Sequence, residues 1–113
     1  MPYIELKTNK KIEKDAEAKL TSLLGELIEI IPGKSEAWLM LNFIDGCNMA
    51  FKGDAAPCAI IEVKIFGSAP DSALDEFTEA ATKAIAPLLS IPSDRIYIKY
   101  ESCNSWGYNG FNF

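Results

Sequence analysis

The sequence predicts an α+β fold in which two β-α-β units form one four-stranded sheet with two helices on one face. Three observations predict it. Short segments show the alternating or continuous apolar pattern of strands, and two longer segments carry apolar residues at helical spacings of three and four. The same order of elements occurs in both halves of the chain. A length of 113 residues suits one domain, so residues 1–113 are expected to form a single domain.

The first half contains a predicted strand, helix and strand. Residues 3–8 alternate between apolar and polar side chains, as a half-buried strand does. Leucines and isoleucines between residues 20 and 31 share one helical face, and Pro32-Gly33 ends that helix. Residues 37–43 (AWLMLNF) are mostly apolar, which favours a strand in the centre of the sheet.

The second half repeats this order. Residues 58–66 (CAIIEVKIF) read as a buried strand, residues 74–88 carry a second apolar stripe, and residues 95–100 (RIYIKY) alternate again. Pro87 should kink or end the helix in its last turn. Strands within each unit are expected to be parallel. The face of the sheet without helices would expose apolar residues, and oligomerisation is the expected source of cover.

The composition excludes several classes of function. A net charge of −5 argues against broad nucleic-acid binding. We expect no membrane partner, because the apolar stretches are short and interrupted by charge. The first residues lack the pattern of a signal peptide, which favours a cytoplasmic location or secretion without such a signal. The three cysteines form no C-x-x-C pair and predict neither a disulfide framework nor a zinc site.

Histidine is absent, so a general base must come from another group. Lysine, glutamate, cysteine and the α-amino group are the candidates. Pro2 directly follows Met1 and precedes the first strand. Proline fits the first position of a strand because it has no N–H to donate, and this alone explains it. Alternatively, an aminopeptidase removes Met1 and leaves a secondary amine, whose pKa near 7.7–8.0 would fall further on burial. With Met1 retained, the Pro2 nitrogen is an amide and cannot act as a base.

The last twelve residues (SCNSWGYNGFNF) place aromatic side chains among glycine and asparagine. They predict an edge strand and turn that pack aromatic rings on the same subunit or on a neighbour. Packing of this kind is compatible with lining a pocket.

Together these features resemble the macrophage migration inhibitory factor family of the tautomerase superfamily. The pieces that carry the resemblance extend over nearly the whole chain, and their order and spacing make the match specific. They are MPYIELKTN at the start, PGK at 32–34, MAFKG at 49–53, PCA at 57–59, DRIYIKY at 94–100 and WGYNG at 106–110.

The resemblance implies a homotrimer in which three four-stranded sheets form a central barrel, with pockets at the subunit boundaries. It implies keto–enol tautomerisation of phenylpyruvate-like or dopachrome-like substrates, an isomerase activity without metal or cofactor. The substrate would be a small aromatic 2-keto acid. The alternative is a cytokine-like ligand that binds a receptor protein and has a vestigial pocket. Hydration or dehalogenation, also found in the superfamily, usually needs arginines, and Arg95 is the only one here.

The resemblance also assigns roles to individual residues. Pro2 would be the catalytic base after loss of Met1. Lys34 would bind the substrate carboxylate or polarise its oxygen, although a lysine at a helix end is also ordinary charge placement. Phe66 lies where a backbone amide contacts the substrate. Tyr97 would be supplied by a neighbouring subunit and donate from its hydroxyl, or else be a half-buried strand tyrosine.

Aromatic residues complete the predicted pocket. Trp106 and Tyr108 are expected to form its wall, with Trp38 and Tyr3 at its mouth, which suits an aromatic substrate. Lys99 departs from the asparagine of the best-known animal members. Its ammonium would hold an anionic substrate and repel a protonated Pro2, or would point to solvent. The family's C-x-x-C motif is also absent, so thiol–disulfide exchange is not expected.

Overall fold

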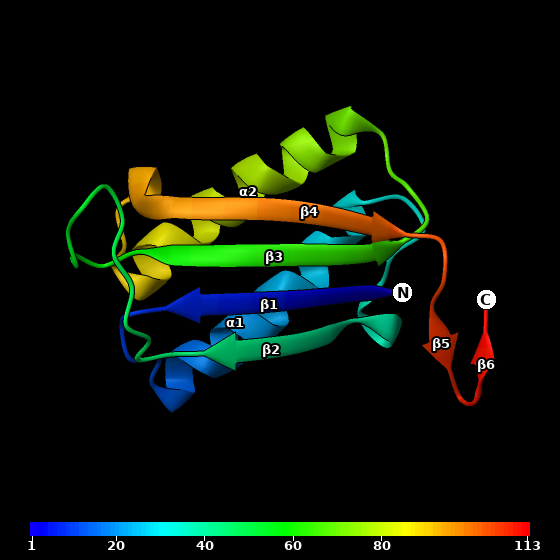
Figure 1. Ribbon diagram of the computed structural model, residues 1–113, viewed down its shortest axis with the longest axis horizontal. Coiled ribbons are helices and arrows are strands. Elements are labelled where there is room, and N and C mark those ends of the chain that lie inside the picture. Colours follow the sequence, from blue (N-terminus) through cyan, green and yellow to red (C-terminus); the bar gives the residue numbers. More distant parts are fainter.

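The computed structural model describes residues 1–113 and shows a mixed four-stranded sheet with both helices on one face (Figure 1). This arrangement confirms the predicted fold class. Three short 3₁₀ helices occupy Ile28–Ile30, Glu36–Trp38 and Ser93–Arg95. The main elements are β1 (Pro2–Thr8), α1 (Lys14–Leu27), β2 (Met40–Ile44), β3 (Ala59–Phe66), α2 (Asp71–Leu89) and β4 (Ile96–Cys103).

The strands have the order β2-β1-β3-β4. Within each unit the strands are parallel, β1 with β2 and β3 with β4, as predicted, and the two units meet through antiparallel β1 and β3. The prediction of a central strand at residues 37–43 is wrong. The strand begins only at Met40 and lies at an edge of the sheet, where Met40 is 65% exposed. An apolar run is compatible with either position, because only the pairing of the two units decides which strands are central.

The core lies between the sheet and the helices. Even-numbered residues of β1 and odd-numbered residues of β3 alternate into it, and the predicted stripes of both helices meet them. Pro87 lies in the last turn of α2, which ends at Leu89, and Ser90 then takes a left-handed conformation with φ of 55°. The fully buried residues at the centre of this core are Ile4, Leu6, Leu20, Leu24, Ile61, Val63, Phe77, Ala81 and Ile85.

The opposite face of the sheet carries charged residues in its middle and, as expected, exposed apolar side chains toward its margins, such as Met40 and Tyr97. Three glutamates and three lysines occupy the outward positions of β1, β3 and β4 in the middle of this face, which we call the open face. The Nζ atom of Lys7 lies 3.2 Å from a carboxylate oxygen of Glu5, and that of Lys99 lies 3.1 Å from Glu101. Hydrated charges do not require an apolar cover. The other two of these six charged residues are Glu62 and Lys64.

The C-terminal residues form a separate hairpin rather than an edge strand of the main sheet. Strands β5 (Gly107–Tyr108) and β6 (Phe111–Asn112) pair only with each other, across a turn in which Asn109 and Gly110 both have positive φ. Figure 1 shows this hairpin beyond the end of the sheet at which β1 begins. It therefore stands next to the N-terminus. No helix in the fold has the length and apolar character needed to cross a membrane.

Candidate active site

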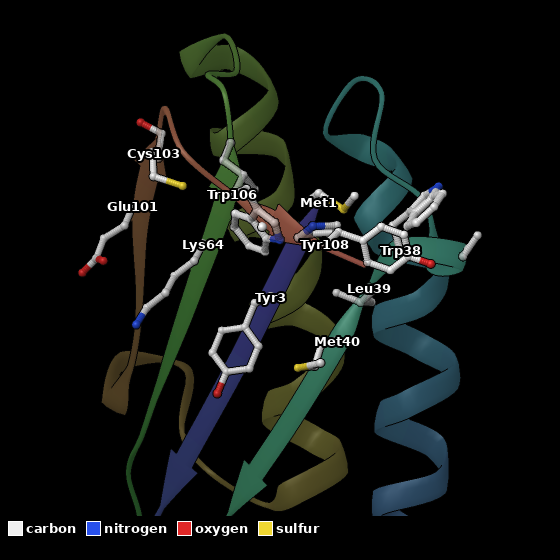
Figure 2. A pocket seen from close by; sticks show the side chains of 15 residues that line it. Met1, Tyr3, Trp38, Leu39, Met40, Lys64, Glu101, Cys103, Trp106 and Tyr108 are labelled. Atoms are coloured by element: carbon white, nitrogen blue, oxygen red, sulfur yellow. The ribbon is translucent and has the colours of Figure 1, made fainter. Parts of the chain in front are cut away.

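A cavity of about 630 Å³ opens at the N-terminal end of β1, between the sheet and the C-terminal hairpin (Figure 2). Ten of its 15 lining residues are hydrophobic, as is common for sites that bind small organic molecules. Five residues of the predicted site line it, namely Pro2, Tyr3, Trp38, Trp106 and Tyr108.

Pro2 is the first residue of β1 and is buried. The Met1 carbonyl oxygen, just before it, accepts a hydrogen bond of 3.1 Å from the backbone N–H of Phe66. Burial, and then the nearby Lys34 ammonium, lower the pKa of the Met1 α-amino group from its ordinary value of 8.0. This environment therefore favours the neutral form of an amine at this end of β1.

Lys34 and Phe66 adjoin this N-terminus but do not line the cavity itself. The chain turns at Gly33, with φ of +78°, and brings Lys34 toward the end of β3. There the Lys34 ammonium donates a hydrogen bond of 2.9 Å to the Phe66 carbonyl oxygen. The two residues predicted to contact a substrate oxygen are thus linked to each other and next to Pro2.

Aromatic rings form one wall of the cavity. The rings of Trp38 and Tyr108 meet edge to face with centroids 5.1 Å apart, as Figure 2 shows at the edge of the pocket. Tyr108 in turn stacks on Phe113 at 6.3 Å, and Phe113 contacts Phe66 at 5.9 Å. This chain of rings joins the hairpin to the 3₁₀ helix Glu36–Trp38 and to the end of β3.

Tyr97 and Lys99 lie away from the cavity within one chain. Tyr97 pairs with Ile60 at the far end of β3, whereas Pro2 pairs with Ile65. Five residues at roughly 3.3 Å each place these two pairs about 17 Å apart along the strand. Lys99 is half exposed on the open face, with Glu101 as its partner. The repulsion of a protonated Pro2 by Lys99 stays a prediction. Within one chain, the lysine beside the N-terminus is Lys34.

The cavity also contains residues that the sequence did not suggest. Lys64 and Glu101 line it because they stand in one row across the sheet with Tyr3, through the pairings Tyr3–Lys64 and Lys64–Glu101. The Lys64 Nζ atom lies 5.9 Å from the centre of the Tyr3 ring. Strand alternation alone indicates that these three side chains point away from the helices. Which of them are neighbours depends on the register, which the sequence does not reveal.

Comparison with known proteins agrees with the fold. The sequence model of the family described as Macrophage migration inhibitory factor (MIF) matches residues 1–113. A macrophage migration inhibitory factor homolog from Brugia malayi is 28% identical over 115 residues, covering 100% of this chain and 99% of the relative.

Two solved structures are similar along almost the whole chain. The crystal structure of Leishmania major MIF2 has a TM-score of 0.93 at 30% identity and covers 100% of this chain and 97% of its own. A macrophage migration inhibitory factor homologue from Prochlorococcus marinus has a TM-score of 0.83 at 34% identity, with 98% of each chain covered. With the family model matched from end to end, this chain belongs to the macrophage migration inhibitory factor family.

Proposed function

We propose that this protein is a keto–enol tautomerase for phenylpyruvate-like or dopachrome-like substrates, with Pro2 as the general base after removal of Met1. The observation that carries the proposal is the position of Pro2. It is buried at the end of an aromatic cavity, next to a lysine ammonium and a backbone amide. The lowered pKa of the Met1 α-amino group, one residue away, supports the same role for an amine at this end of β1.

The proposed reaction moves one proton within the substrate. The neutral Pro2 amine takes a proton from the carbon next to the ketone, and the electron pair of that C–H bond forms the enol double bond. The ketone oxygen gains negative charge and receives that proton from the protonated Pro2 amine, which gives the enol and restores the neutral base; the reverse sequence gives the ketone. Lys34 and the Phe66 N–H, which is released when Met1 is removed, would stabilise charge on the substrate oxygens.

We further propose that the active form is a homotrimer. Tyr97 is about 17 Å from Pro2 along the sheet, by the rise of roughly 3.3 Å per strand residue, so one chain cannot direct both at one small substrate. A neighbouring chain would supply Tyr97 and Lys99 to each cavity. The exposed edge strand β2, with Met40 65% exposed, offers a surface for such a contact. We propose a cytoplasmic location, or secretion without a signal peptide.

The test is phenylpyruvate ketonisation by protein whose mass shows that Met1 is absent, beside a preparation that retains it. We expect turnover only in the trimmed form, because only there is the Pro2 nitrogen an amine. A Pro2→Gly variant, trimmed in the same way, keeps an α-amine but loses the rigid ring, and should retain partial activity.

Each other outcome has a distinct meaning. Equal activity in both preparations would show that Pro2 is not the base. No activity in either form with phenylpyruvate or dopachrome would reject the proposed substrates and favour the alternative role as a receptor-binding ligand.

A further inference from the structure

Arg95, the only arginine of the chain, binds the segment 51–57 through most of the N–H donors of its guanidinium group. Its guanidinium donates hydrogen bonds to four backbone carbonyls and lies 2.9 Å from a carboxylate oxygen of Asp54. Only 12% of the side chain is exposed. The carbonyls belong to Phe51 (3.2 Å), Asp54 (3.4 Å), Ala56 (3.0 Å) and Pro57 (2.9 Å).

The segment that Arg95 holds is a tight turn that presents the Phe51 ring. Phe51 and Asp54 exchange two backbone hydrogen bonds, of 2.9 and 3.2 Å, around Lys52 and Gly53, which both have positive φ. The Phe51 ring has the Arg95 guanidinium 5.2 Å from its centre and the Lys52 ammonium at 5.5 Å. Two cations and a rigid turn thus fix this ring.

The fixed ring contacts Tyr97. The rings of Phe51 and Tyr97 meet at 84° with centroids 4.9 Å apart, which is a favourable edge-to-face geometry. Tyr97 is otherwise 59% exposed, and none of the hydrogen bonds of the chain uses its hydroxyl. Phe51 is therefore the aromatic group that limits the orientations of the Tyr97 ring.

We propose that Arg95 and Phe51 are positioning residues that hold the Tyr97 ring so that its hydroxyl is presented to a substrate in the neighbouring subunit. The inference rests on the proposed function, because Tyr97 contacts a substrate only in that assembly. Arg95 and Phe51 themselves touch no substrate. Their effect passes from the guanidinium to the turn, from the turn to the Phe51 ring, and from that ring to Tyr97.

The test combines NMR of the tyrosine rings with steady-state kinetics on full-length, Met1-trimmed protein. Arg95→Lys keeps the charge facing Asp54 but removes the planar group that reaches four carbonyls. Phe51→Leu keeps apolar bulk and removes the ring. Tyr97→Phe assigns the Tyr97 signals, and thermal unfolding with native mass shows that each variant is folded and assembled like the wild type.

We expect both variants to move the Tyr97 ring signals while those of Tyr100, which is held on the helix side of the sheet by Leu74 and Thr78, stay in place. KM for phenylpyruvate should rise about three- to tenfold with kcat changed less, the size expected for loss of an aromatic pair. Adding Tyr97→Phe to Phe51→Leu should raise KM little further, because both changes act through one hydroxyl. Lys83→Ala, at an exposed side chain of α2 outside the cavity, is the control and should leave KM unchanged.

Two results would overturn the inference. Unmoved Tyr97 signals in folded Phe51→Leu protein would show that Phe51 does not position the ring. Moved signals with an unchanged KM would show that the ring position does not matter to the reaction. If the wild type itself has no turnover, the proposed function fails, and the inferred role of Arg95 and Phe51 in catalysis fails with it. The NMR signals still decide whether Arg95 and Phe51 orient the Tyr97 ring.

Discussion

At the residue scale, the chemistry of the site depends on the environment of one amine. The N-terminal end of β1 is partly buried beside the Lys34 ammonium, and both features disfavour a second positive charge. The Lys34 ammonium is itself held by the Phe66 carbonyl at 2.9 Å, so its charge has a defined position. Both features favour the neutral form of an amine at this position, which the proposed base requires and which needs no histidine.

This geometry predicts the pH dependence of the reaction. The Pro2 amine must be neutral to act, so kcat/KM should fall as pH drops through its pKa. We expect that pKa to be lowered, because burial and then the Lys34 ammonium lower the pKa of the Met1 amine at the same end of β1. Lys34→Ala removes one cause of the lowered pKa, so the acid limb of the kcat/KM profile should move to higher pH. KM for the anionic substrate should also rise. Lys34→Arg keeps the charge and should leave the limb near its wild-type position. An acid limb that stays in place in Lys34→Ala would exclude Lys34 as a cause.

At the scale of elements, the C-terminal hairpin is a wall of the cavity with little part in the core. It contacts the rest of the fold mainly through the Trp38–Tyr108 and Phe66–Phe113 ring pairs. Its residues are mostly exposed, and none belongs to the buried core. Elements with few buried contacts contribute little to global stability.

Removal of residues 104–113 should therefore affect binding more than folding. We expect KM for phenylpyruvate to rise about fivefold or more, because the aromatic side chains of Trp106 and Tyr108 are lost from the cavity. Each loss should weaken binding by the free energy typical of an aromatic contact. The midpoint of thermal unfolding should change by only a few degrees, as expected for a loss of roughly 1 kcal/mol. A loss of the cooperative unfolding transition would show instead that the hairpin is part of the folding unit.

Tyr100 connects β4 to α2 and gives a second prediction for the elements. Its hydroxyl donates to the Leu74 carbonyl oxygen at 3.1 Å and shares a hydrogen bond of 2.7 Å with the Thr78 hydroxyl. Burial raises the pKa of Tyr100 above 10.0, so the folded state favours the neutral phenol. This contribution to stability is complete below pH 10.0 and is lost as pH rises through the raised pKa.

Tyr100→Phe should lower the free energy of unfolding by about 0.5–1.5 kcal/mol at pH 7, the usual net value of a hydrogen bond. The variant should also lose less stability than the wild type between neutral pH and values above 10. Denaturant unfolding at both pH values measures the two effects. Tyr97→Phe, at an exposed hydroxyl, is the control and should change neither value.

At the scale of the whole molecule, one chain separates the residues of the predicted site. Pro2, Lys34 and Phe66 lie at one end of the sheet, and Tyr97 lies at the other. The charged open face and the exposed edge strand β2 are left without a partner in the single chain. The proposed assembly would bring the two ends of different sheets together and give the exposed edge strand β2 a neighbour.

The trimer predicts a solution mass three times the 12.4 kDa of the chain, measured by light scattering or native mass spectrometry. Trimmed Pro2→Gly and Tyr97→Phe proteins can be mixed, dissociated and reassembled. Some cavities should then combine the native Pro2 of one subunit with the native Tyr97 of another. Recovered activity above the mean of the two variants would support cavities shared between subunits. Mixed protein with only the mean activity would contradict them, as would a monomeric mass.

The sequence by itself determined the elements and the faces of this protein, because each depends on local periodicity. Ile4, Leu6, Leu24 and Phe77 are buried as their spacing predicts, and Pro2 stands at the start of a strand. Resemblance to a family then predicted the site residues, five of which share one cavity. The roles of these residues in catalysis stay predictions.

Only the tertiary structure decided which strands are central and which side chains are neighbours. β2 lies at an edge, and Lys64 and Glu101 join Tyr3 in the cavity, because antiparallel pairing of β1 with β3 sets the strand order and the register. The Arg95 clamp on the turn at Phe51 connects residues more than 40 positions apart. Such contacts depend on how distant segments pack together, and local periodicity carries no information about them.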